Sequence, residues 1–379
     1  MRTKPSLLFK LTAVFAVFIA ALVLTLSGCE GNRDEPVSPV SSTLAVTSGD
    51  QIALSKSDSR IIAAMRVQEK HTARLMASRD VVGTAVGLDE AGDVVVKIYT
   101  AREGVAGLPA TLDGMKVDVE VTGIIHAMGK PGGGGGVSHK AKQTPPIQLG
   151  TSGGWAYDLA NGYCCGGTLG SLVVIKGKQY ILSNYHVFES DIVPGGNNRV
   201  AGDGDYVIQP GLIDVSCNAT TAQNVATLVK SSSLPNSNVD AAIAQVISGM
   251  VRTDGSILEV GVLSASTVAA FVNQAVKKSG RTTGLTRSKI TGLNGTVSVT
   301  YDNECAGGTA FTKTFTGQIL VANKASKFLA GGDSGSLMIE DITTNPRAVG
   351  LLFAGSSSIA VANPIGQVLG FFGAAMVGN

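Results

Sequence analysis

The sequence predicts a mainly β protein with a small α+β module in front of it. Charged residues make up only 15% of the chain, glycine is abundant at 48 residues, and hydrophobic residues reach 44%. This composition is typical of short strands and tight turns around a sizeable core, rather than of long solvated helices. From about Gly153 to the C-terminus, short β-rich runs alternate with turn residues, which indicates a β-sandwich or a pair of β-barrels.

The first 28 residues have the architecture of an export signal. Basic residues near the start precede an almost wholly apolar run, Leu11 to Leu26, after which the chain continues Ser-Gly-Cys. These residues resemble a bacterial lipobox, in which the cysteine becomes the acylated first residue of the mature protein. We therefore expect residues 1–28 to be a lipoprotein signal peptide and Cys29 to be the lipidation site that holds the protein at the bacterial cell envelope. The alternatives are an ordinary signal peptide and a single transmembrane anchor, for which the apolar run is short.

The charge balance argues against a nucleic-acid partner. The formal net charge is +2, and three of the 30 Lys and Arg residues lie in the expected leader, which leaves 27 basic residues against 28 acidic ones. The sequence has no basic stripe of the kind that binds nucleic acid.

Four cysteines remain after the leader, and an even number in an exported protein favours disulfides. Adjacent Cys164 and Cys165 fit disulfide geometry poorly with each other, so each is expected to pair with Cys217 or Cys305. Free thiols are the alternative. No histidine stands at ligand spacing from them, so no metal site is expected.

Residues 57–128 are expected to form the α+β module. Apolar residues recur at helix-like intervals from about Ser57 to Ser78, with charged residues between them. Two β-rich runs, Val81 to Leu88 and Asp93 to Tyr99, flank a turn sequence and predict a hairpin. Alternating valines predict a third strand from Met115 to Ile125.

Two segments have the composition of connectors. Residues 29–56 are rich in Ser, Thr and Pro and are expected to be a tether. Residues 129–152 contain five consecutive glycines and a Pro-Pro pair, which indicates an interdomain linker. The β-rich domain then spans 153–379. Near its end, Asn363 as N-cap and Pro364 at the first helical position predict a short C-terminal helix.

A serine in a glycine-rich loop is the candidate nucleophile. Ser334 stands in the sequence Gly-Gly-Asp-Ser-Gly-Ser, residues 331–336. Glycines on both sides permit a tight turn and close approach of a substrate. The backbone amides of Gly332 and Ser334 are the candidate oxyanion donors. The alternative is a plain glycine-rich turn.

A nucleophilic serine also needs a base and a group that orients the base. His186 follows a predicted strand and is the single histidine of the β-rich domain, since the others lie in the module or linker (His71, His126 and His139). Asp240 heads an apolar run, where a carboxylate is costly to bury unless it is paired. Its rivals lie among turn residues, as loop residues do (Asp191, Asp203, Asp205 and Asp214).

Together these motifs resemble the chymotrypsin-like serine proteases. The order is His186, Asp240, Ser334, with separations of 54 and 94 residues, and the run Ala348 to Gly355 is similar to the strand that follows the nucleophile and lines the substrate cleft. Four segments more narrowly resemble a bacterial branch that is also similar to the plant narrow-leaf trypsin-like proteins (181–187, 209–211, 239–244 and 280–284). The resemblance covers about residues 150–375. It implies two six-stranded β-barrels, His186 and Asp240 on the first and Ser334 on the second, and peptide hydrolysis through an acyl-enzyme without metal or cofactor.

Several positions depart from that pattern. Val187 replaces the context that places a disulfide beside the histidine, and no Ile-Val-Gly-Gly segment starts the domain. Activation by a new N-terminus against Asp333 is therefore not expected, and local backbone amides would satisfy this carboxylate. Phe328 stands where trypsins carry an acid at the base of the pocket, so Phe328, Ala354 and Gly355 predict a pocket for an apolar or small residue. Residues 280–284 are interpreted as the turn and first strand of the second barrel, with an anion nest as the alternative.

The sequence therefore predicts an envelope serine endopeptidase that acts on protein or peptide substrates. A catalytically silent scaffold on the same fold and an esterase with the same residues are the alternatives. Residues 57–128 are interpreted either as a pro-region that occupies the cleft until the linker is cut, or as a spacer or docking module.

Overall fold

The computed structural model describes residues 54–127, 137–160, 163–189, 199–302, 310–324 and 326–379. All of these belong to one unit, Ala45–Asn379. The expected signal peptide, nearly all of the tether, the glycine run of the linker, Cys29 and Cys305 lie outside the described residues. Within the described residues, no helix has the length and apolar character needed to cross a bilayer.

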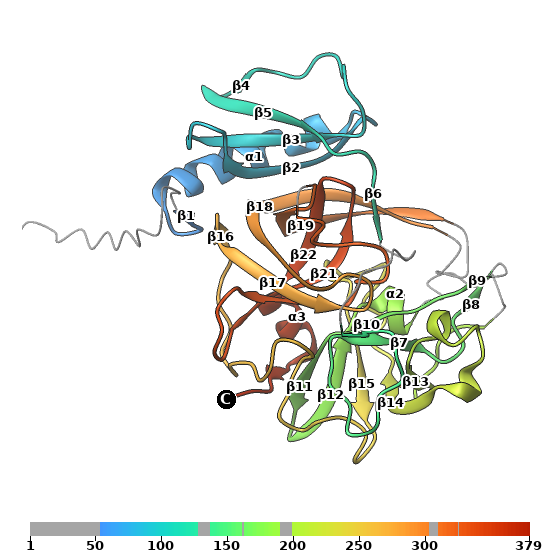
Figure 1. Ribbon diagram of the computed structural model, residues 1–379. Helices are drawn as coiled ribbons and strands as arrows, with labels where there is room; N and C mark the ends of the chain where they lie inside the picture. Colours follow the sequence, from blue (N-terminus) through green and yellow to red (C-terminus); the bar gives the residue numbers. More distant parts are fainter. Residues whose placement is uncertain (1–53, 128–136, 161–162, 190–198, 303–309, 325) are drawn as a thin grey trace, which may run out of the picture. The chain divides into compact units, whose positions relative to one another are not determined.

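The first barrel is a closed antiparallel sheet built from strands in the middle of the chain, drawn in green and yellow in Figure 1. In spatial order its strands are β7 (Thr151–Trp155), β13 (Tyr206–Gln209), β14 (Gln223–Val229), β15 (Ala242–Val246), β12 (Lys178–Ser183) and β11 (Ser171–Ile175). The short β10 (Gly167–Leu169) runs directly into β11 and pairs with β7, which closes the barrel. The core contains Trp155 and Phe188, both fully buried, and β23 (Ala375–Met376) extends the sheet at β11.

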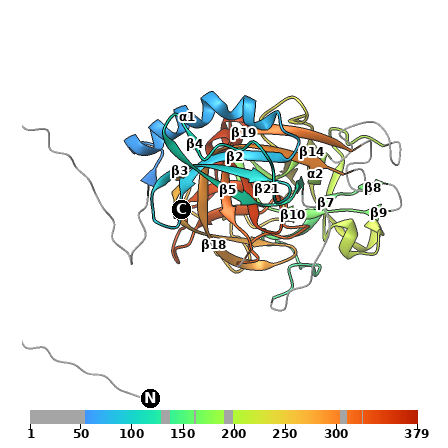
Figure 2. The same ribbon diagram turned by 90° about the horizontal axis from the view of Figure 1, so that it is seen from above.

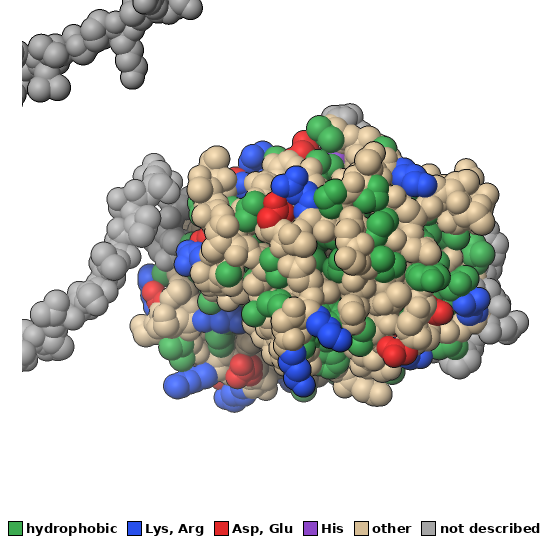
Figure 3. All heavy atoms as spheres, turned by 90° about the horizontal axis from the view of Figure 1, so that it is seen from below, with side chains coloured by type: hydrophobic (Ala, Val, Ile, Leu, Met, Phe, Trp, Pro, Cys, Tyr) green, Lys and Arg blue, Asp and Glu red, His purple; other side chains and the backbone are tan. Residues whose placement is uncertain are grey.

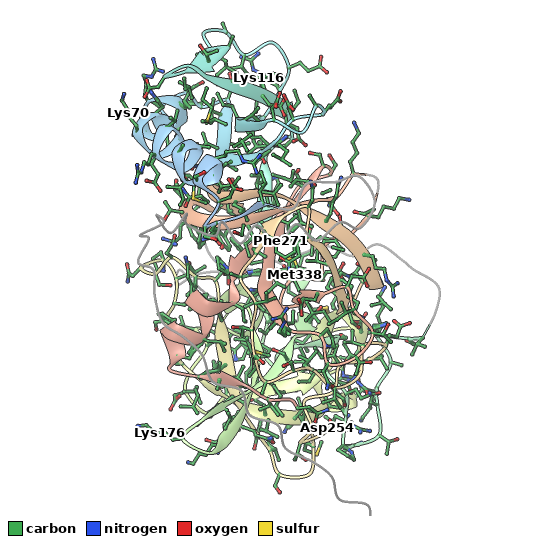
Figure 4. All side chains as sticks on the ribbon, turned by 90° about the vertical axis from the view of Figure 1, so that its left-hand side faces the viewer. Lys70, Lys116, Lys176, Asp254, Phe271 and Met338 are labelled. Atoms are coloured by element: carbon green, nitrogen blue, oxygen red, sulfur yellow. A yellow bond between two sulfur atoms is a disulfide. The ribbon has the colours of Figure 1, made fainter. Side chains whose placement is uncertain are left out.

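The second barrel is also closed. In spatial order its strands are β17 (Ala275–Gly280), β20 (Leu337–Glu340), β21 (Ala348–Gly355), β22 (Ile359–Pro364), β19 (Phe311–Ala322) and β18 (Gly284–Tyr301). Pairing of β17 with β18 closes it. Figure 4 shows Met338 among the side chains inside this barrel, where it is fully buried. The prediction of a chymotrypsin-like double β-barrel is confirmed, and residues 280–284 form the end of β17, a turn and the start of β18.

The N-terminal module has the helix and strands that the sequence predicts. α1 (Ser59–Met76) follows its N-cap residue Asp58, whose carboxylate accepts the Arg60 backbone N–H. Figure 2 shows α1 lying across β2 (Val81–Leu88) and β3 (Val94–Thr100), which form the expected antiparallel hairpin. β5 (Met115–Val121) pairs with β3 in parallel, and β4 (Thr111–Leu112) pairs with β5. Lys70 and Lys116 point outward from this module in Figure 4.

The sheet of the module continues into the second barrel. β2 pairs antiparallel with β18, and the buried Gln68 amide donates to Thr84 Oγ1 and to the Asn294 carbonyl oxygen, both at 3.0 Å. β1 (Leu54–Ser55) pairs with β16 (Phe271–Val272) near the same barrel. Main-chain pairing therefore joins the module to the strand that closes the second barrel.

The predicted third strand of the module is wrong in its length. β5 ends at Val121, Gly123 adopts a φ of +76° that interrupts the extended backbone, and a separate strand, β6 (Ile125–Ala127), follows. β6 pairs with β18 and β21 of the second barrel instead of with the module.

The predicted C-terminal helix is present as α3 (Ile365–Phe372), but its N-cap differs. Asn363 belongs to β22 and Pro364 is the N-cap residue. The Asn363 side chain instead accepts the Asp240 N–H at 2.9 Å and donates to Gln318 Oε1 at 2.6 Å. The remaining elements are short: β8 (Leu159–Ala160), β9 (Tyr163–Cys164), α2 (Tyr185–Phe188) and two 3-10 turns, Leu212–Asp214 and Ala219–Thr221.

Described residues of the expected linker pack against the first barrel. Ile147 and Leu149 are fully buried in its core, and His139 bonds the Gly150 carbonyl and Glu259. On the face seen in Figure 3, acidic and basic side chains lie scattered or in small groups.

One of the expected disulfides is defined. Cys164 is bonded to Cys217. Cys165 is also disulfide-bonded, and Cys305, the partner that remains for it in the prediction, lies outside the described residues. The structure thus assigns Cys217 to Cys164, a choice that the sequence left open.

Candidate functional site

The imidazole of His186 and the carboxylate of Asp240, two residues of the first barrel, form a buried contact. His186 lies in α2, directly after β12, and Asp240 lies just before β15, the neighbour of β12 in the sheet. His186 Nδ1 is 2.6 Å from Asp240 Oδ2, and the His186 N–H donates to Oδ1 at 3.3 Å. Asp240 is fully buried. Because the carboxylate faces Nδ1, it favours the tautomer with the proton on Nδ1, in which Nε2 accepts a proton.

Tyr301 completes this arrangement from the second barrel. Its hydroxyl donates to Asp240 Oδ2 at 2.8 Å, the same oxygen that faces His186. Its ring lies edge-on to the imidazole, with the centroids 5.9 Å apart. Burial raises the pKa of Tyr301 well above its usual value and the Asp240 charge raises it further, so the phenol stays protonated as a donor. Sequence reasoning missed Tyr301, because nothing in the chain marks a tyrosine at the end of a long strand as a partner of Asp240.

Asp240 is also positioned through its own backbone. Its N–H donates to Asn363 Oδ1 on β22, and its carbonyl oxygen accepts the Asn184 side chain at 2.7 Å. Both barrels therefore hold this residue, Asn184 from the first and Asn363 from the second. In the sequence, the one feature that marks Asn363 is its place before a proline, which predicts a helix cap instead.

Ser334 lies in the glycine-rich loop before β20 and is fully buried. Its Oγ is 3.4 Å from the Phe353 carbonyl oxygen, and its own carbonyl accepts the Thr168 N–H at 2.8 Å. Gly332 and Gly335 both have a φ of +90°, a region that favours glycine. A Cβ atom at Gly335 would also collide with Ser183 Oγ and the Thr168 carbonyl oxygen. These contacts tie the loop of Ser334 to the first barrel.

Asp333, next to Ser334, is enclosed by donors. The N–H groups of Thr282, Thr283 and Ala330 donate to its carboxylate at 2.9, 3.1 and 3.0 Å. The Thr283 hydroxyl donates at 2.7 Å, and the ammonium of the fully buried Lys278 lies 3.4 Å away. Burial lowers the pKa of Lys278, and the Asp333 charge opposes this effect. Backbone amides surround Asp333 as the sequence analysis expects, and Lys278 is an additional cation that it did not identify.

The rival carboxylates and histidines have other partners. Asp214 holds the Arg281 guanidinium through two contacts of 2.6 Å. Asp205 accepts the indole N–H of Trp155, and Asp203 accepts the Lys230 N–H. Asp191 lies outside the described residues. His71 Nε2 lies 3.0 Å from Asp113 Oδ1, and His139 Nε2 lies 2.6 Å from Glu259 Oε2.

The three expected pocket residues fall into two places. Phe328 is fully buried in the core of the second barrel. Ala354 and Gly355 are buried at the end of β21, where they pair with Ala127 and His126 of β6. The edge that the sequence analysis assigns to the pocket is thus covered by a segment of the module. Among the described residues, no group of three or more His, Cys, Asp or Glu side chains is placed to hold a metal ion.

Comparisons with known proteins give both a family match and structural matches. A family model described as the Nal1 C-terminal domain matches residues 217–362. A solved glutamic acid specific serine protease, reported to use a novel histidine triad in substrate binding, is 18% identical with a TM-score of 0.41, over 61% of this chain and 100% of that one. Protease A of Thermobifida fusca is 19% identical with a TM-score of 0.41, over 62% of this chain and 99% of that one. Cellulomonas bogoriensis chymotrypsin is 20% identical with a TM-score of 0.38, over 62% and 99%. Comparison with curated proteins gave no match.

Proposed function

We propose that this protein is a serine endopeptidase that cleaves peptide bonds through an acyl-enzyme. The observation that supports the proposal most is the pairing of His186 Nδ1 with the buried Asp240 carboxylate at 2.6 Å. Burial of an unpaired carboxylate carries a large desolvation penalty. Carboxylates that are nevertheless buried beside a histidine are typical of sites where the acid orients a general base. The glycine-rich loop of Ser334 supplies the third residue type that this chemistry requires.

Each residue has one role in the proposed reaction. Ser334 Oγ attacks the peptide carbonyl while His186 Nε2 takes its proton, and Asp240 stabilises the resulting imidazolium. The amides of Gly332 and Ser334 stabilise the negative charge on the carbonyl oxygen. His186 then gives the proton to the leaving amine, and Ser334 stays bound to the acyl group. A water molecule next attacks the acyl carbonyl while His186 Nε2 takes its proton. His186 returns this proton to Ser334 Oγ as the carboxylic acid product leaves. Tyr301 and Asn363 position Asp240 without touching the substrate.

Labelling with a fluorophosphonate tests the proposal. The mature protein is expected to form a covalent adduct at Ser334, and Ser334→Ala abolishes it. Ser298→Ala, a serine on the outer part of β18, serves as the matched control and keeps the label. Absence of labelling in a folded wild-type protein would exclude the enzyme and favour a silent scaffold. A matched pair of peptide and ester substrates separates the two activities. Cleavage of the peptide supports an endopeptidase, whereas cleavage of the ester alone indicates an esterase.

We also propose that Cys29 carries lipid and anchors the protein at the bacterial envelope. The supporting observation is the apolar run that ends in small residues immediately before Cys29. Expression in a bacterial host followed by detergent phase partition tests this, since Cys29→Ser is expected to move the protein from the detergent phase to the aqueous phase. Partition of both forms into the aqueous phase contradicts it.

A further inference from the structure

The short strand β6 lies between two strands of the second barrel. It runs antiparallel to β21, with Ala127 opposite Ala354 and His126 opposite Gly355. It also runs parallel to β18, with Ile125 opposite Val299 and His126 opposite Thr300. β6 is therefore held on both sides by main-chain pairing, although it belongs in sequence to the N-terminal module.

The edge of β21 that β6 covers begins next to Ser334. The Phe353 carbonyl oxygen is 3.4 Å from Ser334 Oγ, and the following residues, Ala354 and Gly355, are the ones that pair with β6. Ala127 is opposite the nearer of these two and His126 opposite the farther one, so β6 runs toward the nucleophile. A substrate peptide can add to this edge as an extended strand whose chain runs, from N-terminus to C-terminus, toward Ser334. Such a peptide would have the same direction as β6 and would pair with the same main-chain groups of β21.

Ile125 anchors the segment. Its side chain is fully buried in the cluster that contains Tyr185, Tyr301 and Phe353. These three residues adjoin the proposed machinery: Tyr185 precedes His186, Tyr301 bonds Asp240, and the Phe353 carbonyl is beside Ser334 Oγ. The preceding residue, Ile124, is 53% exposed. Two isoleucines that are adjacent in sequence thus differ completely in burial.

We propose that Ile125–Ala127 is an intramolecular occupant of the substrate-binding edge of β21, and that the Ile125 site is a subsite for a branched aliphatic residue. This inference rests on the proposed endopeptidase function. A substrate of this site is an extended peptide that runs toward Ser334, carries an aliphatic side chain at the Ile125 position, and replaces β6 on β21.

Two kinds of active-site reagent separate the edge from the nucleophile. A small alkyl fluorophosphonate needs Ser334 only. A peptidyl diphenyl phosphonate that copies the sequence of the segment also needs the edge of β21. This reagent is acetyl-Ile-His-Ala followed by the phosphonate analogue of methionine, which is the next residue in the chain. With the full mature protein, Ile125→Ala is expected to raise the rate of modification by the peptidyl reagent by about tenfold or more, since truncation of a fully buried isoleucine weakens the competing segment by at least that factor. The rate with the fluorophosphonate is expected to change much less. Ile124→Ala, the exposed neighbour, changes neither rate.

The identity of the first residue in the reagent tests the subsite. Against Ile125→Ala, the reagent that begins with isoleucine is expected to react faster than one that begins with glycine. Equal rates for the two reagents contradict the aliphatic subsite. An unchanged peptidyl rate in Ile125→Ala, with normal fluorophosphonate labelling, overturns the occupancy while the proposed function stands. No fluorophosphonate labelling of any form removes the proposed function and this inference with it.

A reversible crosslink covers the case in which Ile125→Ala misfolds. Ala127 and Ala354 are directly opposite in an antiparallel pair, a separation that a disulfide spans with small adjustment. In Ala127→Cys/Ala354→Cys, oxidation is expected to suppress reaction with the peptidyl reagent, and mild reduction is expected to restore it. The single variant Ala127→Cys, given the same treatments, shows no such change. Equal peptidyl rates in the oxidised and reduced forms of the double variant overturn the proposal.

Discussion

The carboxylate of Asp240 collects contacts from both barrels. Its two oxygens receive the His186 imidazole, the His186 N–H and the Tyr301 hydroxyl. These donors fix the orientation of the carboxylate relative to the imidazole. At the scale of single residues, the orientation of the imidazole thus depends on a phenol that belongs to the other barrel.

Tyr301→Phe tests that dependence. Removing the hydroxyl deletes the 2.8 Å hydrogen bond that helps to hold Asp240 Oδ2 against the imidazole. We expect kcat/KM to fall by roughly tenfold, the value of about one hydrogen bond to a charged group. Tyr206→Phe, a change at an exposed tyrosine of the first barrel, is the control and keeps the wild-type kcat/KM. A wild-type kcat/KM in Tyr301→Phe would contradict the positioning role of this phenol.

Lys278 is predicted to stabilise the fold by pairing with Asp333, since both side chains are fully buried. Lys278→Met removes the counter-charge of this buried carboxylate. The free energy of unfolding is therefore expected to fall by about 3–5 kcal/mol. Lys277→Met on the same strand is the matched control, since the Lys277 ammonium bonds the Ile342 carbonyl oxygen, and about 1 kcal/mol is expected there. Urea unfolding measures both. The double variant Lys278→Met/Asp333→Asn should recover part of the loss, and no recovery would argue against a charge effect.

At the scale of elements, the loop of Ser334 depends on two glycines. Gly335→Ala places a Cβ at a φ of +90° and against Ser183 and the Thr168 carbonyl. Strain of about 1–2 kcal/mol from the backbone alone, with the collision in addition, is expected to lower the melting temperature and to abolish fluorophosphonate labelling. Gly366→Ala in α3, where a Cβ meets no atom within 4 Å, is the control and should be neutral or slightly stabilising. Normal labelling of Gly335→Ala would show that the loop tolerates another conformation.

Residues that belong to a local element of the sequence can be predicted, whereas residues that act through a distant partner cannot. His186, Asp240 and Ser334 can be selected as candidates from the sequence because each stands beside or within a local pattern, a strand or a glycine-rich turn. Tyr301 and Lys278 act only through partners far away in the chain, so no local pattern marks them. The predicted extent of the third strand of the module was wrong because β-branched residues continue past Val121, as Thr122, Ile124 and Ile125, while a single glycine among them, Gly123, interrupts the extended backbone.

At the scale of the described unit, main-chain pairing of β2 with β18 makes the module part of the second barrel's sheet. We therefore expect one cooperative thermal transition, with the fluorescence of Trp155 in the first barrel and the far-UV circular dichroism of the whole chain changing together. Gln68→Ala removes the buried bonds to Thr84 and Asn294 and is expected to lower this single transition. Gln179→Ala, at the start of β12 in the first barrel, where the side chain donates to the Thr253 carbonyl oxygen, is the control. Two resolved transitions would show that the module unfolds alone.

The pairing of β6 with β21 has a kinetic and thermodynamic consequence. A segment of the same chain competes for the site at an effective concentration set by the connecting residues, commonly about millimolar for a short tether. Dilution of the protein leaves that concentration unchanged, so occupancy by Ile125–Ala127 does not weaken at low protein concentration, as an inhibitor added in solution would. Under the proposed occupancy, we expect short peptides at micromolar concentration to be excluded by this competition. We expect substrates to be long segments that gain contacts beyond the edge of β21.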